Sequence, residues 1–470
     1  SMGSVGGVAA IAVLGASCLC LGGCGPGTSV SFSEIGAVAP DQLRTDSAEP
    51  EARAQPAPTK VHRSSDFGWT EGQDISEAFA RLLQDGTLMA GEELVLEHTY
   101  RISGEYTLPD RFTLSAMKGA GFAVTDATVK HKPGPALLEL GDGCTLHNLT
   151  ITYLDTPPLG PTGEKPGVTF SGRLGIRADG KHNLRIENCR LIGSIGHHVR
   201  MSNCRKVEFI GCHIAGGHWS VFTDGGSDMV FRRCLIEQCQ GDAIKGGGDR
   251  VLVEDCAFQD NLRDGIDTAG GLNDAVIRNC TFRRMKVSAM DIKSFYDSPS
   301  ALKRPKNVGI LIERCLFHDM PNGIVLTTMD VQRGKGGEAL LTAENMKKYA
   351  PHDIELKNCV IGHAEKPLQP KRDGGYGVNY PSDADEHMRA IRIKDGYGVR
   401  YRNLRLSGER IRTVYVRSDT ETVYARFLSK EAADALGPDQ ATGNVLDEPV
   451  PPINPGVTEV PFPCGLQQLD

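Results

Sequence analysis

The sequence predicts an all-β solenoid in which short strands stack in coils of about 22 residues. The main observation is a strand-like phrase of alternating apolar residues, followed by a polar pair, a cysteine, one residue and another apolar residue. It recurs as LRIENCRL (184–191), VEFIGCHI (207–214), VFRRCLI (230–236), VLVEDCAF (251–258), VIRNCTF (276–282), LIERCLF (311–317) and IELKNCVI (354–361). A second phrase recurs in the same frame, as GDAIKGGG (241–248), DGIDTAGG (264–271) and SAMDIKSF (288–295).

The cysteines set the length of a coil. From Cys189 to Cys280 the spacings of successive phrase cysteines are 23, 22, 22 and 24 residues. Steps of 35 and 44 residues then lead to Cys315 and Cys359 and indicate insertions or an extra coil. Equivalent side chains of neighbouring coils lie about 4.8 Å apart. We therefore expect a buried file of free thiols, which behave as small hydrophobes, in preference to disulfides or a metal site.

Composition and charge narrow the class of partner. The chain has 470 residues and a formal net charge of −7 at pH 7. Because the sequence holds no long basic block, we do not expect a nucleic-acid partner. An acidic substrate stays open, because the local charge of a cleft decides its binding. We expect a large soluble body that acts as a monomer.

The N-terminal residues predict export. The apolar run AAIAVLGASCLCLGG (9–23) is too short for a comfortable membrane span. Its end, LGGC (21–24), resembles the lipobox of bacterial lipoproteins, which implies that residues 1–24 are a signal segment and that Cys24 is lipidated. A low-complexity Gly/Ala leader is the alternative. Residues 25–62 predict a flexible tether, so the expected location is the periplasm or a lipid anchor in the outer membrane of a bacterium.

The coils are expected over residues 63–420, with a cap at each end. DISEAFARLLQDG (74–86) predicts an N-terminal capping helix with Asp74 as N-cap and Glu77 three residues further on. Its apolar face consists of Ile75, Phe79, Leu82 and Leu83. Residues 421–470 hold a short helical stretch and a Pro-rich tail, which we interpret as a C-terminal cover and tail.

Residues about 11 positions after each phrase cysteine form one column across the coils. The apolar residues that precede them, such as Ile244 and Met290, are expected to point inward, so the column points outward. Its members are Arg200, Phe222, Lys245, Asp267, Asp291, Val325 and Arg392. A second outward column lies two residues further on and comprises Ser202, Asp224, Gly247, Ala269, Lys293, Thr327 and Lys394.

Charged residues concentrate on this outward side. Within 52 residues lie Asp242, Lys245, Asp264, Asp267, Asp291 and Lys293. A single pair such as Lys245 with Asp267 is also explained as a surface ion pair worth less than about 1 kcal/mol. Carboxylates stacked about 5 Å apart repel, so one takes up a proton or a cation neutralises both. Gly-rich corners leave a shallow surface for a chain-like ligand, with walls at 294–307 and 328–350 and Tyr296 as a sugar platform.

The repeat resembles the right-handed parallel β-helix of pectate lyases and related carbohydrate-active proteins, over about residues 90–420. The stretch SDFGWTEGQDISEAF (65–79) is similar to the opening of pectin-degrading β-helix proteins. This resemblance implies a polysaccharide ligand. The stretches GDAIK and NLRDGID (261–267) are similar to the calcium-binding run of the family-nine pectate lyases, which is a closer resemblance.

That closer likeness implies a calcium site. Carried over position by position, it makes Asp242, Asp264 and Asp267 the metal ligands, while Arg263 stands where the family has the first Asp of its cluster. A lysine downstream is the base in those enzymes, and Lys293 is the nearest candidate here.

The function that the resemblance implies is β-elimination on a uronic acid polymer. The enzyme must neutralise the uronate carboxylate and place a base against the neighbouring proton. We expect Lys293 with a depressed pKa as the base, and Arg392 or Lys245 to bind the carboxylate. His197, His198 and His218 are reserve candidates for the base. Further substrate contacts are expected from Arg200, Asp224, Arg263, Tyr296, His197 and His218.

Alternatives remain open at this level. A glycoside hydrolase would use Asp267 and Asp291 as its two carboxylates, and IRIK (391–394) resembles an element of polygalacturonases. An epimerase would share the first step of the lyase and release no product. A non-catalytic β-helix would bind polysaccharide and tolerate substitution of the charged columns. The polymer also stays open among pectate, alginate and an exopolysaccharide.

Overall fold

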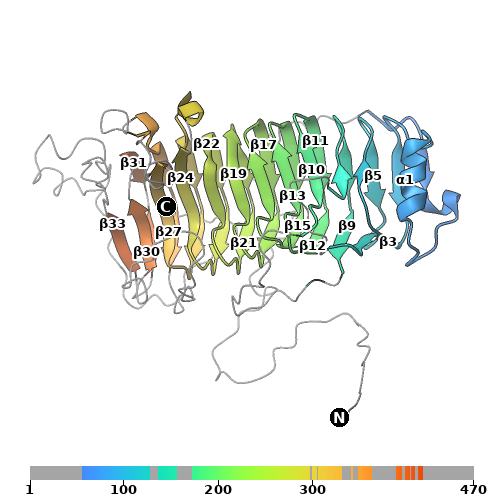
Figure 1. The fold of residues 1–470 in the computed structure, drawn as a ribbon. Coiled ribbons are helices and arrows are strands. Elements are labelled where there is room, and N and C mark those ends of the chain that lie inside the picture. The colour runs from blue at the N-terminus through green and yellow to red at the C-terminus, as the bar shows by residue number, and fades with distance from the viewer. Residues whose placement is uncertain are drawn as a thin grey trace, which may run out of the picture. The chain divides into compact units, whose positions relative to one another are not determined.

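The computed structural model describes residues 56–127, 136–154, 156, 172–296, 299–303, 305–330, 340–341, 348–362, 388–393, 397–402, 404–407 and 411–416. Over these residues the chain winds into a parallel β-helix, which confirms the predicted all-β solenoid (Figure 1). Each full coil contributes one strand to each of three faces. The predicted leader, the lipidation site Cys24 and the C-terminal cover lie outside the described residues.

The first face carries the predicted outward columns. Its strands are β4 (Tyr106–Thr107), β7 (Leu138–Glu139), β10 (Ile176–Asp179), β13 (Val199–Ser202), β16 (Val221–Asp224), β19 (Ile244–Asp249), the start of β22 (Ile266–Arg278), β24 (Ser288–Tyr296), β27 (Asn322–Asp330), β30 (Met388–Ile393) and β33 (Ile411–Val416). Every pairing along this face is parallel, so each strand sits on the strand of the coil before it.

The second face follows in each coil and holds the start of the cysteine phrase. Its strands are β1 (Val61–Arg63), β2 (Glu93–Leu96), β5 (Thr113–Ala116), β8 (Thr145–His147), β11 (His182–Glu187), β14 (Arg205–Ile210), β17 (Ser227–Arg232), β20 (Leu252–Glu254), the end of β22, β25 (Val308–Glu313), β28 (His352–Lys357) and β31 (Tyr397–Arg402).

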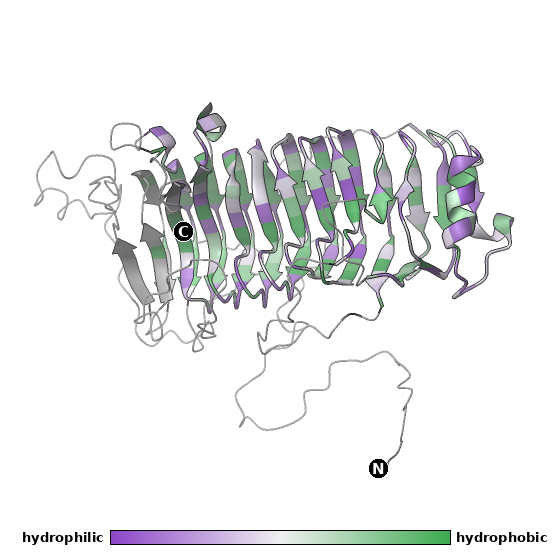
Figure 2. Ribbon diagram, viewed as in Figure 1, coloured by the Kyte–Doolittle hydropathy of each residue, from purple (hydrophilic) through white to green (hydrophobic). Residues whose placement is uncertain are grey.

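The third face forms a separate sheet. Its strands are β3 (Thr99–Ile102), β6 (Gly121–Val124), β9 (Thr150–Tyr153), β12 (Arg190–Ser194), β15 (His213–Gly216), β18 (Leu235–Glu237), β21 (Ala257–Gln259), β23 (Thr281–Arg283), β26 (Leu316–His318), β29 (Val360–Gly362) and β32 (Arg405–Ser407). Hydrophobic and hydrophilic residues alternate along many of these strands (Figure 2), as expected when one side of each strand faces the core.

The core consists of stacked columns of identical side chains. Phe258, Phe282 and Phe317 lie on successive coils with ring centroids 4.7 and 5.3 Å apart, and the rings are nearly parallel. The seven phrase cysteines form another such column. All seven are buried free thiols, which confirms the predicted thiol file.

The residue before each phrase cysteine turns the chain from the second face to the third. It has a left-handed backbone at every coil, with φ between 51° and 63°. The residues are Asn188, Gly211, Arg233, Asp255, Asn279, Arg314 and Asn358. Asn, Asp and Gly adopt this conformation most readily, which explains the residue at five of the seven turns, and the other two carry arginine.

The predicted capping helix is present as α1 (Ser76–Gln84), after a short 3-10 turn, η2 (Ser64–Phe67). Its Phe79 is fully buried against Tyr106 and Phe122 and covers the first coils. The predicted N-cap is wrong by one residue: Ile75 is the N-cap, and Asp74 instead accepts hydrogen bonds from the amide and hydroxyl of Ser76.

Segments from the predicted walls pack onto the end of β24 rather than standing over a groove. Tyr296 is fully buried, packs against Tyr349, and donates a hydrogen bond of 2.9 Å to the Tyr349 carbonyl. Leu341 and the turn η3 (Pro299–Lys303) join this small second core. The prediction of Tyr296 as a sugar platform is therefore wrong, because its ring has no exposed surface.

Candidate functional site

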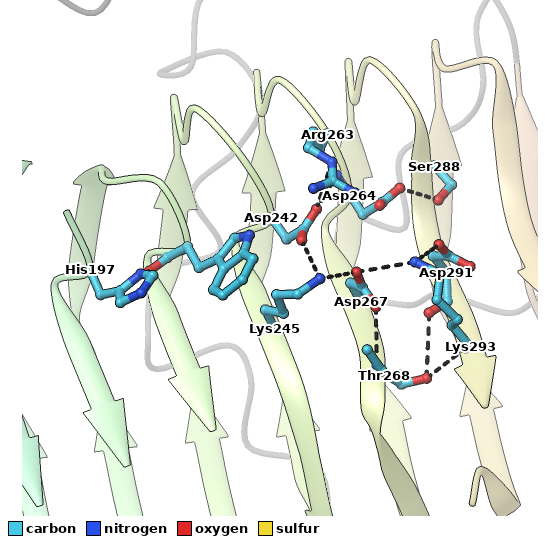
Figure 3. Close-up of polar contacts among 12 residues, drawn as sticks. His197, Asp242, Lys245, Arg263, Asp264, Asp267, Thr268, Ser288, Asp291 and Lys293 are labelled. Atoms are coloured by element: carbon cyan, nitrogen blue, oxygen red, sulfur yellow. Dashed lines mark hydrogen bonds and ion pairs between the residues drawn. The ribbon is translucent and has the colours of Figure 1, made fainter. Parts of the chain in front are cut away.

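Strand register aligns the first predicted column as expected. It pairs Arg200 with Phe222, Phe222 with Lys245, Lys245 with Asp267, Asp267 with Asp291, Asp291 with Val325, and Val325 with Arg392. Six coils of the first face thus carry the column from β13 to β27, and β30 continues it. The corner residues Asp242 and Asp264, which precede β19 and β22, also come together with it (Figure 3).

A bulge in β22 interrupts the second column. Gly247 pairs with Gly271 and not with Ala269, because β22 holds two extra residues at this point. The predicted equivalence of Gly247 and Ala269 is therefore wrong, whereas Lys293 and Thr327 pair as predicted. The bulge turns the Ala269 amide toward Asp267, to which it donates a hydrogen bond of 3.0 Å.

Glycine is required beside this bulge. Gly246 has φ of 124°, and a Cβ at this position would lie 1.7 Å from the Thr223 carbonyl oxygen. The Gly-rich corner therefore serves close packing of neighbouring coils.

The charged residues point outward but are largely shielded from solvent. Asp242 and Asp267 have no exposed surface, Asp264 is 1% exposed and Asp291 8% exposed. The prediction of a solvated face with surface ion pairs is wrong, because neighbouring coils lie so close that each side chain covers the next. Buried ion pairs depend on their partners far more than exposed ones do.

A chain of ion pairs links three coils. Lys245 Nζ lies 3.0 Å from Asp242 Oδ2 and also binds Asp267 Oδ2. Lys293 Nζ lies 3.3 Å from the same Asp267 oxygen and 2.6 Å from Asp291 Oδ2. The Arg263 side chain lies beside Asp242, with Nε 3.5 Å from Oδ1. Four carboxyl groups thus face three cations, an excess of one negative charge.

The surroundings of Asp242 and Asp264 shift their pKa values in opposite directions. Burial alone would raise the pKa of Asp242, but the charges of Lys245 and Arg263 outweigh it and hold that pKa below its usual value. Burial and the nearby Asp242 charge raise the pKa of Asp264 well above its usual value. Asp264 also accepts a hydrogen bond from the Ser288 hydroxyl on the next coil. Protonation of one carboxyl group with a raised pKa would remove the excess negative charge of the cluster.

The expectation of Lys293 as a base with a depressed pKa is wrong. Burial alone would lower the pKa of Lys293, but the charges of Asp291 and Asp267 outweigh it and raise the pKa above the usual value. Its backbone is fixed as well, since the Lys293 amide donates a hydrogen bond of 3.0 Å to the Thr268 hydroxyl. An ammonium group held in this way donates hydrogen bonds and binds anions.

Aromatic residues continue the charged column toward the N-terminus. Lys245 Nζ lies 4.7 Å from the ring centroid of Trp219, and His197 stacks on the same ring at 5.2 Å. Phe222 stacks on Trp219 at 5.3 Å, with the Arg200 guanidinium 5.5 Å from its centroid. Our sequence reasoning missed Trp219, although it is one of only two tryptophans and stands at a coil corner next to His218.

The remaining predicted residues lie at varying distances from the cluster. Asp224 is exposed at the end of β16. Burial, followed by the charges of His197 and Arg263, lowers the pKa of His218 to about 3, so its imidazole is neutral at neutral pH. Register places Arg392 two coils beyond Asp291, roughly 10 Å along the stack, and its side chain lies outside the described structure.

The predicted calcium ligands come together, but their surroundings do not suit the ion. One carboxylate oxygen from each of Asp242, Asp264 and Asp267 lies within 4.8 Å of the others. Calcium needs six to eight oxygen ligands, and here the Lys245 ammonium already binds two of the three carboxylates. The residues present therefore do not fit calcium.

A buried histidine beside the site predicts loss of stability in acid. His198 is 1% exposed, and burial lowers its pKa from 6.5 to about 4. Between these values the unfolded chain binds a proton that the folded chain does not, so the free energy of unfolding falls as the pH falls. We expect a loss of about 3 kcal/mol between pH 7 and pH 4, measured as the difference between wild type and His198→Gln in denaturant titrations.

The control for this prediction is Val199→Ala, because Val199 is buried next to His198 in the sequence and carries no titratable group. Its difference from wild type should not change with pH. An equal pH dependence in wild type and His198→Gln would contradict the assignment.

Comparison with known proteins supports the architecture. A family model described as "Right handed beta helix region" matches residues 138–296, and the fold is a right-handed parallel β-helix. The crystal structure of PfbA, a surface adhesin of Streptococcus pneumoniae, is similar with a TM-score of 0.53 and 13% identity. The match covers 76% of this chain and 91% of that chain. No curated protein matches the sequence.

Two further crystal structures share the fold. The Dettilon tailspike protein has a TM-score of 0.50 and 12% identity, over 76% of this chain and 68% of that chain. The catalytic unit of the GH87 alpha-1,3-glucanase from Streptomyces thermodiastaticus strain HF3-3 has a TM-score of 0.50 and 13% identity. That match covers 86% of this chain and 69% of the glucanase chain. At these identities the likeness establishes the fold alone.

Proposed function

We propose that this chain is an exported carbohydrate-active enzyme that cleaves an acidic polysaccharide bound across β16, β19, β22 and β24. The observation that carries the proposal is the layering of charge at the site. The side chains of Arg263, Lys245 and Lys293 are 25%, 13% and 12% exposed, whereas those of Asp242 and Asp267 beneath them are fully buried. A ligand therefore meets these three cations, with the equally exposed Asp291 beside Lys293, before it reaches Asp242 or Asp267. The carboxylates of a uronate polymer suit the cations.

The proposed reaction is glycoside hydrolysis by Asp267 and Asp291. These residues pair in register on adjacent strands. The backbones of such strands lie about 4.8 Å apart, which allows the two carboxyl groups to take the separation of about 5 Å found in retaining glycosidases. Burial and the Asp267 charge raise the pKa of Asp291 above its usual value although Lys293 opposes them. Asp291 is then the acid that protonates the leaving oxygen.

Asp267 is the nucleophile in this scheme: its carboxylate attacks the anomeric carbon as the glycosidic C–O bond breaks, and a water molecule activated by the deprotonated Asp291 then hydrolyses the glycosyl ester. The Asp267 carboxylate is covered by the ammonium groups of Lys245 and Lys293. When the carboxylates of the substrate bind these ammonium groups, the lysines turn outward and uncover Asp267. An acidic polymer would thus both bind to the site and expose its second carboxylate.

A second candidate is β-elimination on the same polymer, with His218 in place of Lys293 as base. One observation favours it: His218 is unprotonated at neutral pH and feels the charges of Arg263 and Lys245, which would neutralise a uronate carboxylate.

Among the similar structures, the glucanase supports a carbohydrate-cleaving function and the adhesin supports a location outside the cell. The lipid anchor at Cys24 stays a prediction, and no helix within the described residues is long and apolar enough to cross a membrane.

The test is a product assay of the full chain with pectate, alginate, acidic exopolysaccharides and a neutral alpha-1,3-glucan. Hydrolysis is expected to yield new reducing ends on an acidic polymer, without the ultraviolet absorbance of an unsaturated uronate. Reducing ends that appear together with this absorbance, and that vanish in His218→Ala, would establish elimination instead. Cleavage of only the neutral glucan would contradict the acidic substrate. Binding without either product and without any change in the uronate composition of the polymer would establish a non-catalytic role.

A further inference from the structure

We infer that the ammonium group of Lys245 takes the role that a calcium ion has in the lyases this chain resembles, so that the acidic cluster is built without a metal. The inference concerns cation binding and does not depend on whether the chain cleaves a polysaccharide. It rests on the positions of Lys245 and Arg263 and on the surroundings of Asp264.

Lys245 bridges two of the three carboxylates. It extends from β19, between the corner that carries Asp242 and the coil that carries Asp264 and Asp267 (Figure 3). Its nitrogen lies 3.0 Å from Asp242 Oδ2 and binds Asp267 Oδ2. An ammonium group has three N–H donors, so it can join carboxylates from two coils, as a metal ion would.

Arg263 removes the remaining need for a divalent ion. It stands at the position where the resembled motif has an aspartate, and its Nε lies 3.5 Å from Asp242 Oδ1. An acidic ligand is thus replaced by a cation directly beside the cluster. Lys293 supplies a further positive charge at 3.3 Å from Asp267, so a calcium ion here would meet three like charges at short range.

Of the three predicted calcium ligands, Asp264 has a carboxylate oxygen without a hydrogen-bond partner among the described residues, and Asp291 on the next coil has another. Asp264 Oδ1 accepts the Ser288 hydroxyl, while its Oδ2 is buried and has no hydrogen-bond partner within the described part of the chain. Two such oxygens cannot replace the six to eight ligands that calcium takes. The geometry nevertheless implies that a calcium site would emerge if Lys245 and Arg263 were replaced.

The experiment measures calcium-dependent thermal unfolding of the full chain, with a chelator in one arm and magnesium as the ionic control. Wild type should unfold at the same temperature with calcium and with chelator. Lys245→Met/Arg263→Asp, which restores a fourth carboxylate, should gain a calcium-specific rise of several degrees and a dissociation constant of about 10⁻⁵ to 10⁻³ M. The matched control is Lys293→Met, which removes a lysine of the same cluster but leaves Lys245 in place, and it should gain no calcium response.

Two results would overturn the inference. One is calorimetric binding of calcium to wild type that is lost in Asp264→Asn, because the ion would then coexist with Lys245. The other is a folded double variant that shows no calcium response. If the double variant does not fold in either arm, calorimetry on wild type and on Lys245→Gln/Arg263→Gln decides, since only the variant that lacks both cations should bind calcium.

Discussion

Asp267→Ala is expected to lower the free energy of unfolding by about 3–5 kcal/mol, the usual cost of leaving a buried charge without its partner. Asp267 has no exposed surface and binds both Lys245 and Lys293. Its removal leaves two ammonium groups, each with an exposed side-chain fraction of 13% or less, sharing Asp242 and Asp291 as their remaining anions. Chemical denaturation at neutral pH measures the loss.

Two further variants separate lost charge pairing from lost packing. Asp224→Ala, on the exposed end of β16, should stay within about 0.5 kcal/mol of wild type. Lys245→Met/Asp267→Ala also removes one of the two ammonium groups, so that Lys293 keeps Asp291 and Asp242 keeps Arg263. It should recover most of the stability, because apolar replacements for buried ion pairs are often close to neutral. A double variant no more stable than Asp267→Ala would show that packing, and not charge, causes the loss.

The fold was readable from the sequence because every coil repeats the same physical requirements. A left-handed turn residue, a buried cysteine and alternating apolar positions recur together, as in Asn188–Cys189 and Asn279–Cys280. Such constraints are local and periodic, so counting residues is enough to align the coils. Register therefore agrees with the predicted first column from Arg200 to Arg392.

The candidate site could be predicted only in part from the sequence, because its properties depend on contacts between coils. Counting residues from the phrase cysteines aligned Asp267 with Asp291. The count could not reveal that neighbouring side chains bury both carboxyl groups. The bulge at Thr268 adds two residues to one coil and breaks the count for the second column. The burial of Tyr296 depends on Tyr349, 53 residues further along the chain.

Burial of charge on the outer side of a solenoid has a simple physical origin. Parallel strands about 4.8 Å apart bring outward side chains of successive coils into contact. In a row of charged side chains, those in the middle are therefore covered by their neighbours and shielded from water. The same stacking raises the pKa of Lys293, whose sequence environment alone looks like that of an accessible base. Protonation states at such a site therefore follow from the neighbouring coils rather than from the local motif.

Asp291→Asn is expected to reduce the cleavage rate by about 10²- to 10⁴-fold on the polymer that the product assay identifies, the usual contribution of a general acid. Asparagine keeps the shape of the side chain and its place beside Lys293, but it has no proton to give to the leaving oxygen. Because burial raises the pKa of Asp291, the acid form persists to higher pH than for an exposed aspartate. The wild-type rate should therefore fall as the pH rises through this raised pKa, and the variant should lose that alkaline limb.

Substrate affinity and stability distinguish this chemical role from a structural one. Asp291→Asn should keep its affinity for the polymer, since Arg263 and Lys245 remain in place, whereas Lys245→Met should weaken binding. The Asp291→Asn protein should also remain folded under assay conditions, because Lys293 retains Asp267 as an anion at 3.3 Å. A variant that still cleaves at the wild-type rate, or one whose rate keeps the same alkaline limb, would assign the acid to another group, and Asp264, the other described carboxyl of the cluster with a raised pKa, would be tested next.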